Sequence, residues 1–226
     1  MSARDSILAR LRNGVANQQA GRSRAELPPL AELPQAQWKS QFMALMSSNH
    51  AELYECSEAQ VVDTLVSVLN SKQIRTLGMG EQERNQPLQQ ALMAAIPGLD
   101  AQLMTTAVEA DAASATRSWL FEGLQAGLTH ARAALAETGS LVIETGPEEP
   151  RTLSLVPPLS IVLVRESSLM SGVTALMQQQ TGQRMPTNLL LVSGPSKTAD
   201  IQQTLAYGAH GPKELVIVWI TDGTGE

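Results

Sequence analysis

The amino-acid sequence predicts an α/β fold in which an open, mostly parallel sheet is flanked by helices and preceded by an N-terminal helical arm. Apolar runs of the fully buried kind recur along the chain and are clearest at 140–144, 160–165, 188–193 and 214–221. Segments with helical periodicity stand among such runs, at 57–68, 87–96 and 169–177. Buried strands that alternate with amphipathic helices are typical of a parallel sheet.

The chain divides into two predicted parts, a helical arm over residues 1–50 and an α/β domain over residues 51–226. Residues 13–34 combine glycine, glutamine and proline, which favours an extended linker. Pro34 is well placed in the first turn of a helix that runs to about Asn49. The apolar residues of that helix share one side: Trp38, Phe42, Leu45 and Met46. We therefore expect the arm to dock on the body or on a partner.

The elements between residues 52 and 139 are less distinct. Strands are expected at 52–56, 74–78 and, more weakly, 102–105. Helices are expected from Ser57, over 87–96, over 112–123 and over 129–136. Thr129 is expected to cap the last of these helices and Gly139 to end it.

The composition excludes several classes of function. Sixteen basic and twenty-two acidic residues give a net charge of −6 without a basic cluster, so no nucleic-acid partner is expected. Cys56 is the only cysteine and cannot by itself hold an iron–sulfur cluster or zinc, and no histidines or acids share metal-ligand spacing. The first residues lack a signal core and no apolar run approaches the roughly 20 residues that span a bilayer, so we expect a cytoplasmic protein.

The first candidate loop surrounds Glu137. At the end of a helix the macrodipole disfavours a carboxylate, which would suit Glu137 to the role of general base or nucleophile. Thr138 and Gly139 are its expected ligand-binding neighbours. The alternative is a structural ion pair, for example with Arg165.

The second candidate loop follows the strand at 188–193. A helix that begins here would offer its first amides to an anion, as in other helix-start anion sites. The expected anion-binding residues are Gly194, Ser196, Lys197, Thr198 and Asp200. The Walker A spacing is absent. An ordinary capped turn remains an alternative.

The third candidate loop precedes the last strand. His210 lies between Gly208 and Gly211, which makes it a second catalytic candidate, and Gly211 and Lys213 are candidate ligand-binding residues. A lone histidine that bonds a backbone carbonyl is the structural alternative. Our hypothesis is that Glu137 and the second and third loops line one pocket that holds a small carboxylate or phosphate-bearing ligand.

Five short motifs occur in one order along the chain: Gly127-Leu128-Thr129-His130-Ala131, Ala136-Glu137-Thr138-Gly139-Ser140, Leu155-Val156-Pro157-Pro158, Gly194-Pro195-Ser196-Lys197-Thr198-Ala199-Asp200-Ile201 and Gly208-Ala209-His210-Gly211-Pro212-Lys213. This series resembles the lactate utilization (LUD) domain family, and specifically its LutC/YkgG branch. The resemblance implies a fold similar to the NagB/RpiA/CoA-transferase superfamily. It also implies membership in a three-component system that oxidises L-lactate to pyruvate.

The same resemblance implies that the iron–sulfur clusters lie in partner subunits, and that this chain is the small subunit without a redox centre or cofactor of its own. Two alternatives stay open. One is a stand-alone enzyme of the CoA-transferase or sugar-phosphate type that uses Glu137 beside an anion site. The other is a purely structural assembly subunit.

The purified chain is expected to be colourless and free of iron, because its one thiol cannot complete a cluster. Metal analysis and a visible absorption spectrum check this expectation. Stoichiometric iron with a visible band would contradict it.

Overall fold

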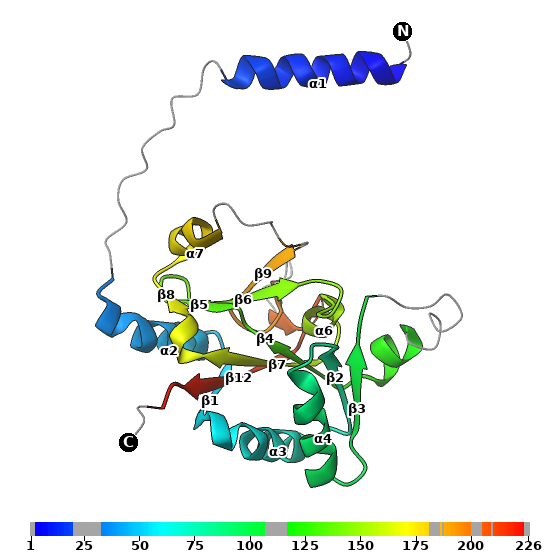
Figure 1. Cartoon of the computed structure of the whole chain (residues 1–226), viewed down its shortest axis with the longest axis vertical. Helices are drawn as coiled ribbons and strands as arrows, with labels where there is room; N and C mark the ends of the chain where they lie inside the picture. The colour runs from blue at the N-terminus through cyan, green and yellow to red at the C-terminus, as the bar shows by residue number, and fades with distance from the viewer. Residues whose placement is uncertain are drawn as a thin grey trace. The chain divides into compact units, whose positions relative to one another are not determined.

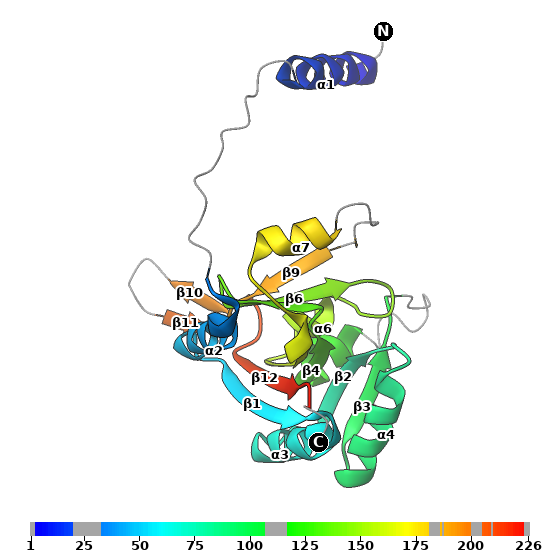
Figure 2. The ribbon, with the colours of Figure 1, turned by 60° about the vertical axis from the view of Figure 1, so that its left-hand side comes forward.

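The computed structural model describes residues 3–19, 33–106, 117–180, 186, 188–199, 205–208 and 210–223. The chain divides into two compact units, residues 1–32 and residues 33–226. The first unit contains helix α1 (Ala3–Gln19). The second unit holds the other elements that the structure describes and is shown in Figures 1 and 2.

The larger sheet of the second unit confirms the predicted open, parallel α/β fold. Its six strands follow the order β1-β12-β7-β4-β2-β3, and every neighbouring pair is parallel. The strands are β1 (Glu52–Ser57), β2 (Thr76–Gly80), β3 (Asp100–Met104), β4 (Ala126–His130), β7 (Leu159–Arg165) and β12 (Glu214–Thr221). The central strands are buried on both faces, which explains their nearly continuous apolar sequences.

One face of this sheet is covered by α3 (Val61–Ser71) and α4 (Asn85–Ala95), which lie together on that side in Figures 1 and 2. The short helix η2 (Glu58–Gln60) precedes α3, and Ser57 caps it as expected, in a capping box with Gln60. Alternate strand residues meet these helices because successive side chains of a strand point to opposite faces. They include Leu77, Met79, Leu128, Ile161, Leu163, Val216 and Val218.

The opposite face is covered by α2 (Trp38–Ser48), preceded by η1 (Gln35–Gln37), and by a second, four-stranded sheet. Phe42 of α2 is fully buried, and its ring centroid lies 5.3 Å from that of Trp219 in β12. Helix α2 therefore packs as part of the body. The compact unit begins at Leu33, whereas the sequence predicts an α/β domain that begins at residue 51.

The second sheet has the order β8-β5-β6-β9 and is mostly antiparallel. Its strands are β5 (Ala133–Leu135), β6 (Ser140–Thr145), β8 (Leu169–Met170) and β9 (Asn188–Val192). Leu176 of helix α7 (Val173–Gln180) packs in a buried cluster with Ala133 and Leu135 of β5 and Val142 of β6. The remaining elements are η3 (Trp119–Gly123), α6 (Thr152–Leu155), η4 (Glu166–Ser168), β10 (Lys197–Ala199) and β11 (Leu205–Tyr207).

Two local predictions are wrong. Residues 129–136 do not form a helix, because Thr129 lies fully buried within β4 and the following alanines pair in β5. No helix begins at Lys197, since residues 197–199 form β10 and pair with β11 in an antiparallel hairpin. In both places tertiary pairing overrides the local helix signal.

Glycines in β2 and β4 let a later segment of the chain lie directly on the sheet. Gly78 and Gly127 are register partners, and α6 crosses them. A methyl group at Gly127 would collide with the backbone carbonyl of Leu153, and one at Gly80 would collide with Glu149. This close approach fixes where the segment from Glu149 to Leu153 lies.

Gly127→Ala is expected to lower the free energy of unfolding by about 1–3 kcal/mol, the range for overpacking, because a backbone carbonyl cannot rotate away. Chemical denaturation measures the change. Gly146→Ala is the matched control, since a methyl group there meets nothing within 4 Å. Equal stability of the two variants would contradict the close approach.

Candidate functional site

The strand order places a crevice at the carboxyl ends of β2 and β4. From β2 the chain passes through α4 to β3 on one side, while from β4 it continues towards β7 on the other side. Neighbouring strands whose connections leave in opposite directions form a topological switch point, the usual ligand position in open α/β sheets. Two cavities, of about 390 Å³ and 620 Å³, open at this edge and share Arg84, His130, Ala131 and Arg132.

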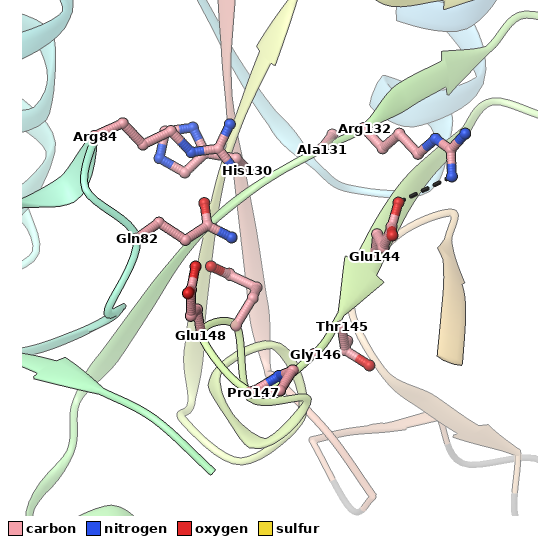
Figure 3. Close-up of a pocket in the computed structure, with 11 residues that line it drawn as sticks. Gln82, Arg84, His130, Ala131, Arg132, Glu144, Thr145, Gly146, Pro147 and Glu148 are labelled. Atoms are coloured by element: carbon pink, nitrogen blue, oxygen red, sulfur yellow. Dashed lines mark hydrogen bonds and ion pairs between the residues drawn. The ribbon is translucent and has the colours of Figure 1, made fainter. Parts of the chain in front are cut away.

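The smaller cavity is strongly polar (Figure 3). We call it the polar compartment. Its lining comes from the loop after β2, the end of β4 and the turn after β6: Gln82, Arg84, His130, Ala131, Arg132, Glu144, Thr145, Gly146, Pro147, Glu148 and Glu149. Both signs of charge face one space, so the cavity can bind an ionic ligand and move a proton.

A buried hydrogen-bond chain orients His130. Asn85, at the start of α4, is fully buried and donates from Nδ2 to the carbonyl of Gly80 at 2.8 Å. Its Oδ1 therefore faces Nε2 of His130 at 2.7 Å and accepts a hydrogen bond from the Nε2–H group. The histidine is held as the Nε2–H tautomer, which leaves Nδ1 as a hydrogen-bond acceptor.

The surroundings of His130 keep its ring neutral. Burial lowers its pKa from 6.5 to about 3, and the positive charges of Arg84 and Arg165 act in the same direction. His130 thus adds no positive charge to the crevice near neutral pH.

Glu149 presents a buried carboxyl group to the polar compartment. Its residue is only 3% exposed, and neither carboxyl oxygen has a hydrogen-bond partner among the residues that the structure describes. A tight turn holds it, closed by the hydrogen bonds Gly146 N to Glu149 O and Glu149 N to Gly146 O. Burial raises its pKa from 4.5 to about 7, although the charge of Arg84 opposes the rise. A carboxyl group poised near neutral pH is suited to proton transfer.

Arg84 supplies the positive charge of the crevice. It lines both cavities, and no carboxylate of the described chain lies within ion-pair distance of its guanidinium. Burial lowers its pKa from the ordinary value, and Arg165 adds to that effect. Arg132, on the other side in Figure 3, is already paired with Glu144 at 2.9 Å. Arg84 is therefore the group best placed to bind an added anion.

The structure gathers only part of the residues that the sequence suggested. Gly194, Ser196, His210 and Gly211 line a third cavity of about 250 Å³. Ser160 and Leu215 also line this cavity, and they lie near the first residues of β7 and β12. This cavity therefore opens at the amino ends of the strands.

Lys197 and Lys213 are not among the described residues that line that cavity. Lys197 donates to Asn49 Oδ1 at 3.3 Å, and the side chain of Lys213 lies against Gly208. Thr198 lies in β10, and Asp200 falls outside the described residues. Because no helix begins at Lys197, the proposed set of helix-start amides is also absent there.

Glu137 lies in a separate turn. Its amide donates to Ser171 O at 2.9 Å and its carboxylate lies beside Gly172. The helix whose dipole was to activate Glu137 is absent, because strand β5 precedes it. Its neighbours Thr138 and Gly139 face Ser140 and Leu45, respectively. Arg165, the suggested partner of Glu137, is paired with Glu58 instead.

The sequence motifs alone do not predict the crevice. One signal was present, since the motif from Gly127 to Ala131 ends a buried strand with His130. Because Thr129 in this motif is also a common helix cap, the sequence favoured a helix start there and not the carboxyl end of a strand. Glu149 gave no signal, because acidic residues beside prolines are typical of exposed turns.

Within the part of the chain that the structure describes, no group of three or more histidine, cysteine or acidic residues could hold a metal ion. In the same ranges no helix is long and apolar enough to cross a membrane.

Comparison with known proteins settles the family. Residues 39–220 match the model of the LUD domain. The chain belongs to the LUD domain family. This confirms the resemblance drawn from the five motifs.

Several relatives support the same assignment. Protein NMB1437 of Neisseria meningitidis is 49% identical over 102 residues, and YkgG of Escherichia coli is 36% identical over 106 residues. These matches span 44% and 46% of the relatives' lengths, and 44% and 45% of this chain. Lactate utilization protein C of Macrococcus caseolyticus is 27% identical over 212 residues, which cover 87% of this chain and 90% of that protein.

A solved structure shares the fold. The crystal structure of a DUF162 family protein from Deinococcus radiodurans matches with a TM-score of 0.57 at 20% sequence identity. The match covers 85% of this chain and 99% of that chain.

Replacement of Glu149 should change how stability depends on pH. The pKa of Glu149 in the folded state lies above that of an ordinary glutamate, so the folded chain holds a proton that the unfolded chain releases between about pH 4.5 and 7. The stability that this group contributes therefore falls as the pH rises through that range. Glu149→Gln has no proton to lose, so it should match the wild type near pH 4 and exceed it by about 2–3 kcal/mol near pH 8.

Urea unfolding at several pH values measures this difference. His130, whose pKa is lowered, acts in the opposite direction below its ordinary pKa, but it is present in both proteins and cancels in the comparison. Glu148→Gln is the control, because Glu148 is the exposed neighbour in the same turn. A difference that does not vary with pH would contradict the burial of an unpartnered carboxyl group at Glu149.

Proposed function

We propose that this chain takes part in lactate utilization as the non-redox subunit of a system that oxidises L-lactate to pyruvate. The relatives named lactate utilization protein C support this role, one of them over most of both chains. The proposal assigns the iron–sulfur clusters to partner subunits. Cys56, the one cysteine, supports that assignment because it is buried in the core cluster beneath α3.

In this role the crevice between β2 and β4 binds a small carboxylate. The observation that carries the proposal is the position of Arg84, an exposed side chain that lines both cavities and lies outside ion-pair distance of every carboxylate in the described ranges. A carboxylate there gains charge-assisted hydrogen bonds, which the planar guanidinium can form in pairs.

The groups around the bound carboxylate suit a hydroxy or oxo acid. Nδ1 of His130 can accept a hydrogen bond from a hydroxyl group, since Nε2 is committed to Asn85. Glu149 can donate a proton to an oxo group when protonated or accept one from a hydroxyl group when ionised. Neither group needs a metal or redox centre for this.

Arg84→Gln should weaken the binding of L-lactate and pyruvate by about 10- to 150-fold, the range for loss of a charged hydrogen bond. Isothermal titration calorimetry or ligand-observed NMR measures the affinities. Lys197→Gln is the control, because it removes one positive charge beside the amino-end cavity. Thermal unfolding of both variants checks that the fold is intact.

The opposite pattern, with binding lost in Lys197→Gln and retained in Arg84→Gln, would contradict the crevice as the carboxylate site. Turnover by the isolated wild-type chain would replace the subunit role with that of a stand-alone enzyme.

A further inference from the structure

We propose that the crevice takes an organic anion larger than lactate, with its acidic group at Arg84 and an apolar body in the larger cavity. We call that cavity the apolar compartment. The inference rests on the proposed function for the place of the acidic group. It adds a second binding region and the class of ligand that fills it.

The cavity volumes favour a larger organic anion over lactate as the ligand that fills the crevice. The apolar compartment has a volume of about 620 Å³, which is larger than that of the polar compartment. The polar compartment of about 390 Å³ already has room for a three-carbon acid, so lactate leaves the apolar compartment unfilled. Both cavities fall within the usual range of about 300–1,000 Å³ for pockets that hold ligands much larger than lactate.

The walls of the apolar compartment are built for an apolar group. Their apolar part consists of side chains from the first two turns of α3 and α4 and from near the ends of β7 and β12: Val61, Val62, Pro87, Leu88, Ala91, Leu163 and Ile220. Val62 and Leu88 pack against the core yet stay partly exposed. Covering such a surface with an apolar ligand is favourable by about 25 cal/mol per Å².

The charged side chains that line the apolar compartment leave one cation available to bind one acidic group. Glu58 and Arg165 are paired with each other at 2.7 Å, and Arg132 is paired with Glu144 at 2.9 Å. Arg84 is left as the cation at the junction of the two compartments. The ligand is therefore a monoanion with its apolar body beyond the acidic group.

A chain-length series tests this with defined probes. Straight-chain monocarboxylates from propanoate to octanoate are titrated into the full chain by calorimetry, with L-lactate alongside. Affinity is expected to rise about fourfold for each added methylene group, which corresponds to ~0.8 kcal/mol per buried CH₂. The rise continues while the tail extends along the apolar compartment.

Two matched variants of α4 distinguish binding in the apolar compartment from nonspecific hydrophobic binding to other surfaces. Ala91 lines the apolar compartment, whereas Ala94 is exposed on the same helix and does not. Ala91→Leu fills the space, so it should remove most of the chain-length dependence, with the greatest loss of affinity for octanoate and the smallest for propanoate. Ala94→Leu should behave like the wild type.

Each outcome bears on a different proposal. Affinity that is flat with chain length while lactate still binds would overturn the apolar compartment and leave the proposed function intact. A steep series that Arg84→Gln does not weaken would overturn Arg84 as the anchor of both ligands. A steep series unchanged in Ala91→Leu would assign the binding to another surface and overturn the inference.

Discussion

The candidate site depends on one steric constraint, the absence of side chains at Gly78, Gly80 and Gly127 on one face of β2 and β4. Because these positions are bare, the segment that carries Glu149 lies directly on the strands, and a side chain at Gly80 would displace its carboxyl group. The same approach seats α6 over the register pair of Gly78 with Gly127. Because of these glycines, the segment from Glu149 to Leu153 forms one side of a crevice at the end of the parallel sheet. The crevice is open because the connections after β2 and β4 leave in opposite directions.

Burial in that crevice determines which of its ionisable side chains are charged. It lowers the pKa of His130 to about 3 and raises that of Glu149 to about 7, and in each case it favours the uncharged form. Arg84 stays charged because a guanidinium loses its proton only far above neutral pH. The crevice therefore combines a fixed cation with an oriented, neutral imidazole and a carboxyl group that changes protonation near neutral pH. That combination suits an organic acid better than a metal ion or a cation.

The sequence predicted the fold far better than the site. Continuous apolar strands such as β7 and β12 are readily predicted from the sequence, because a strand that is buried on both faces needs apolar residues along its whole length. The alanine-rich stretch after His130 has high helix propensity, and only its pairing with β6 and β8 makes it a strand. The loops around Ser196 and His210 do share a cavity, but at the amino ends of the strands. Glu149 could not be found locally, since its environment comes from Gly80, far away in the sequence.

The most direct test of the account is the mapping of backbone amide shifts by NMR while L-lactate is added to the isotope-labelled chain. The account predicts that the largest changes occur at the carboxyl ends of β2 and β4 and in the turn that carries Glu149, including residues 80–85, 130–132 and 146–149. Changes confined to residues 194–197 and 210–213, at the opposite end of the sheet, would contradict it.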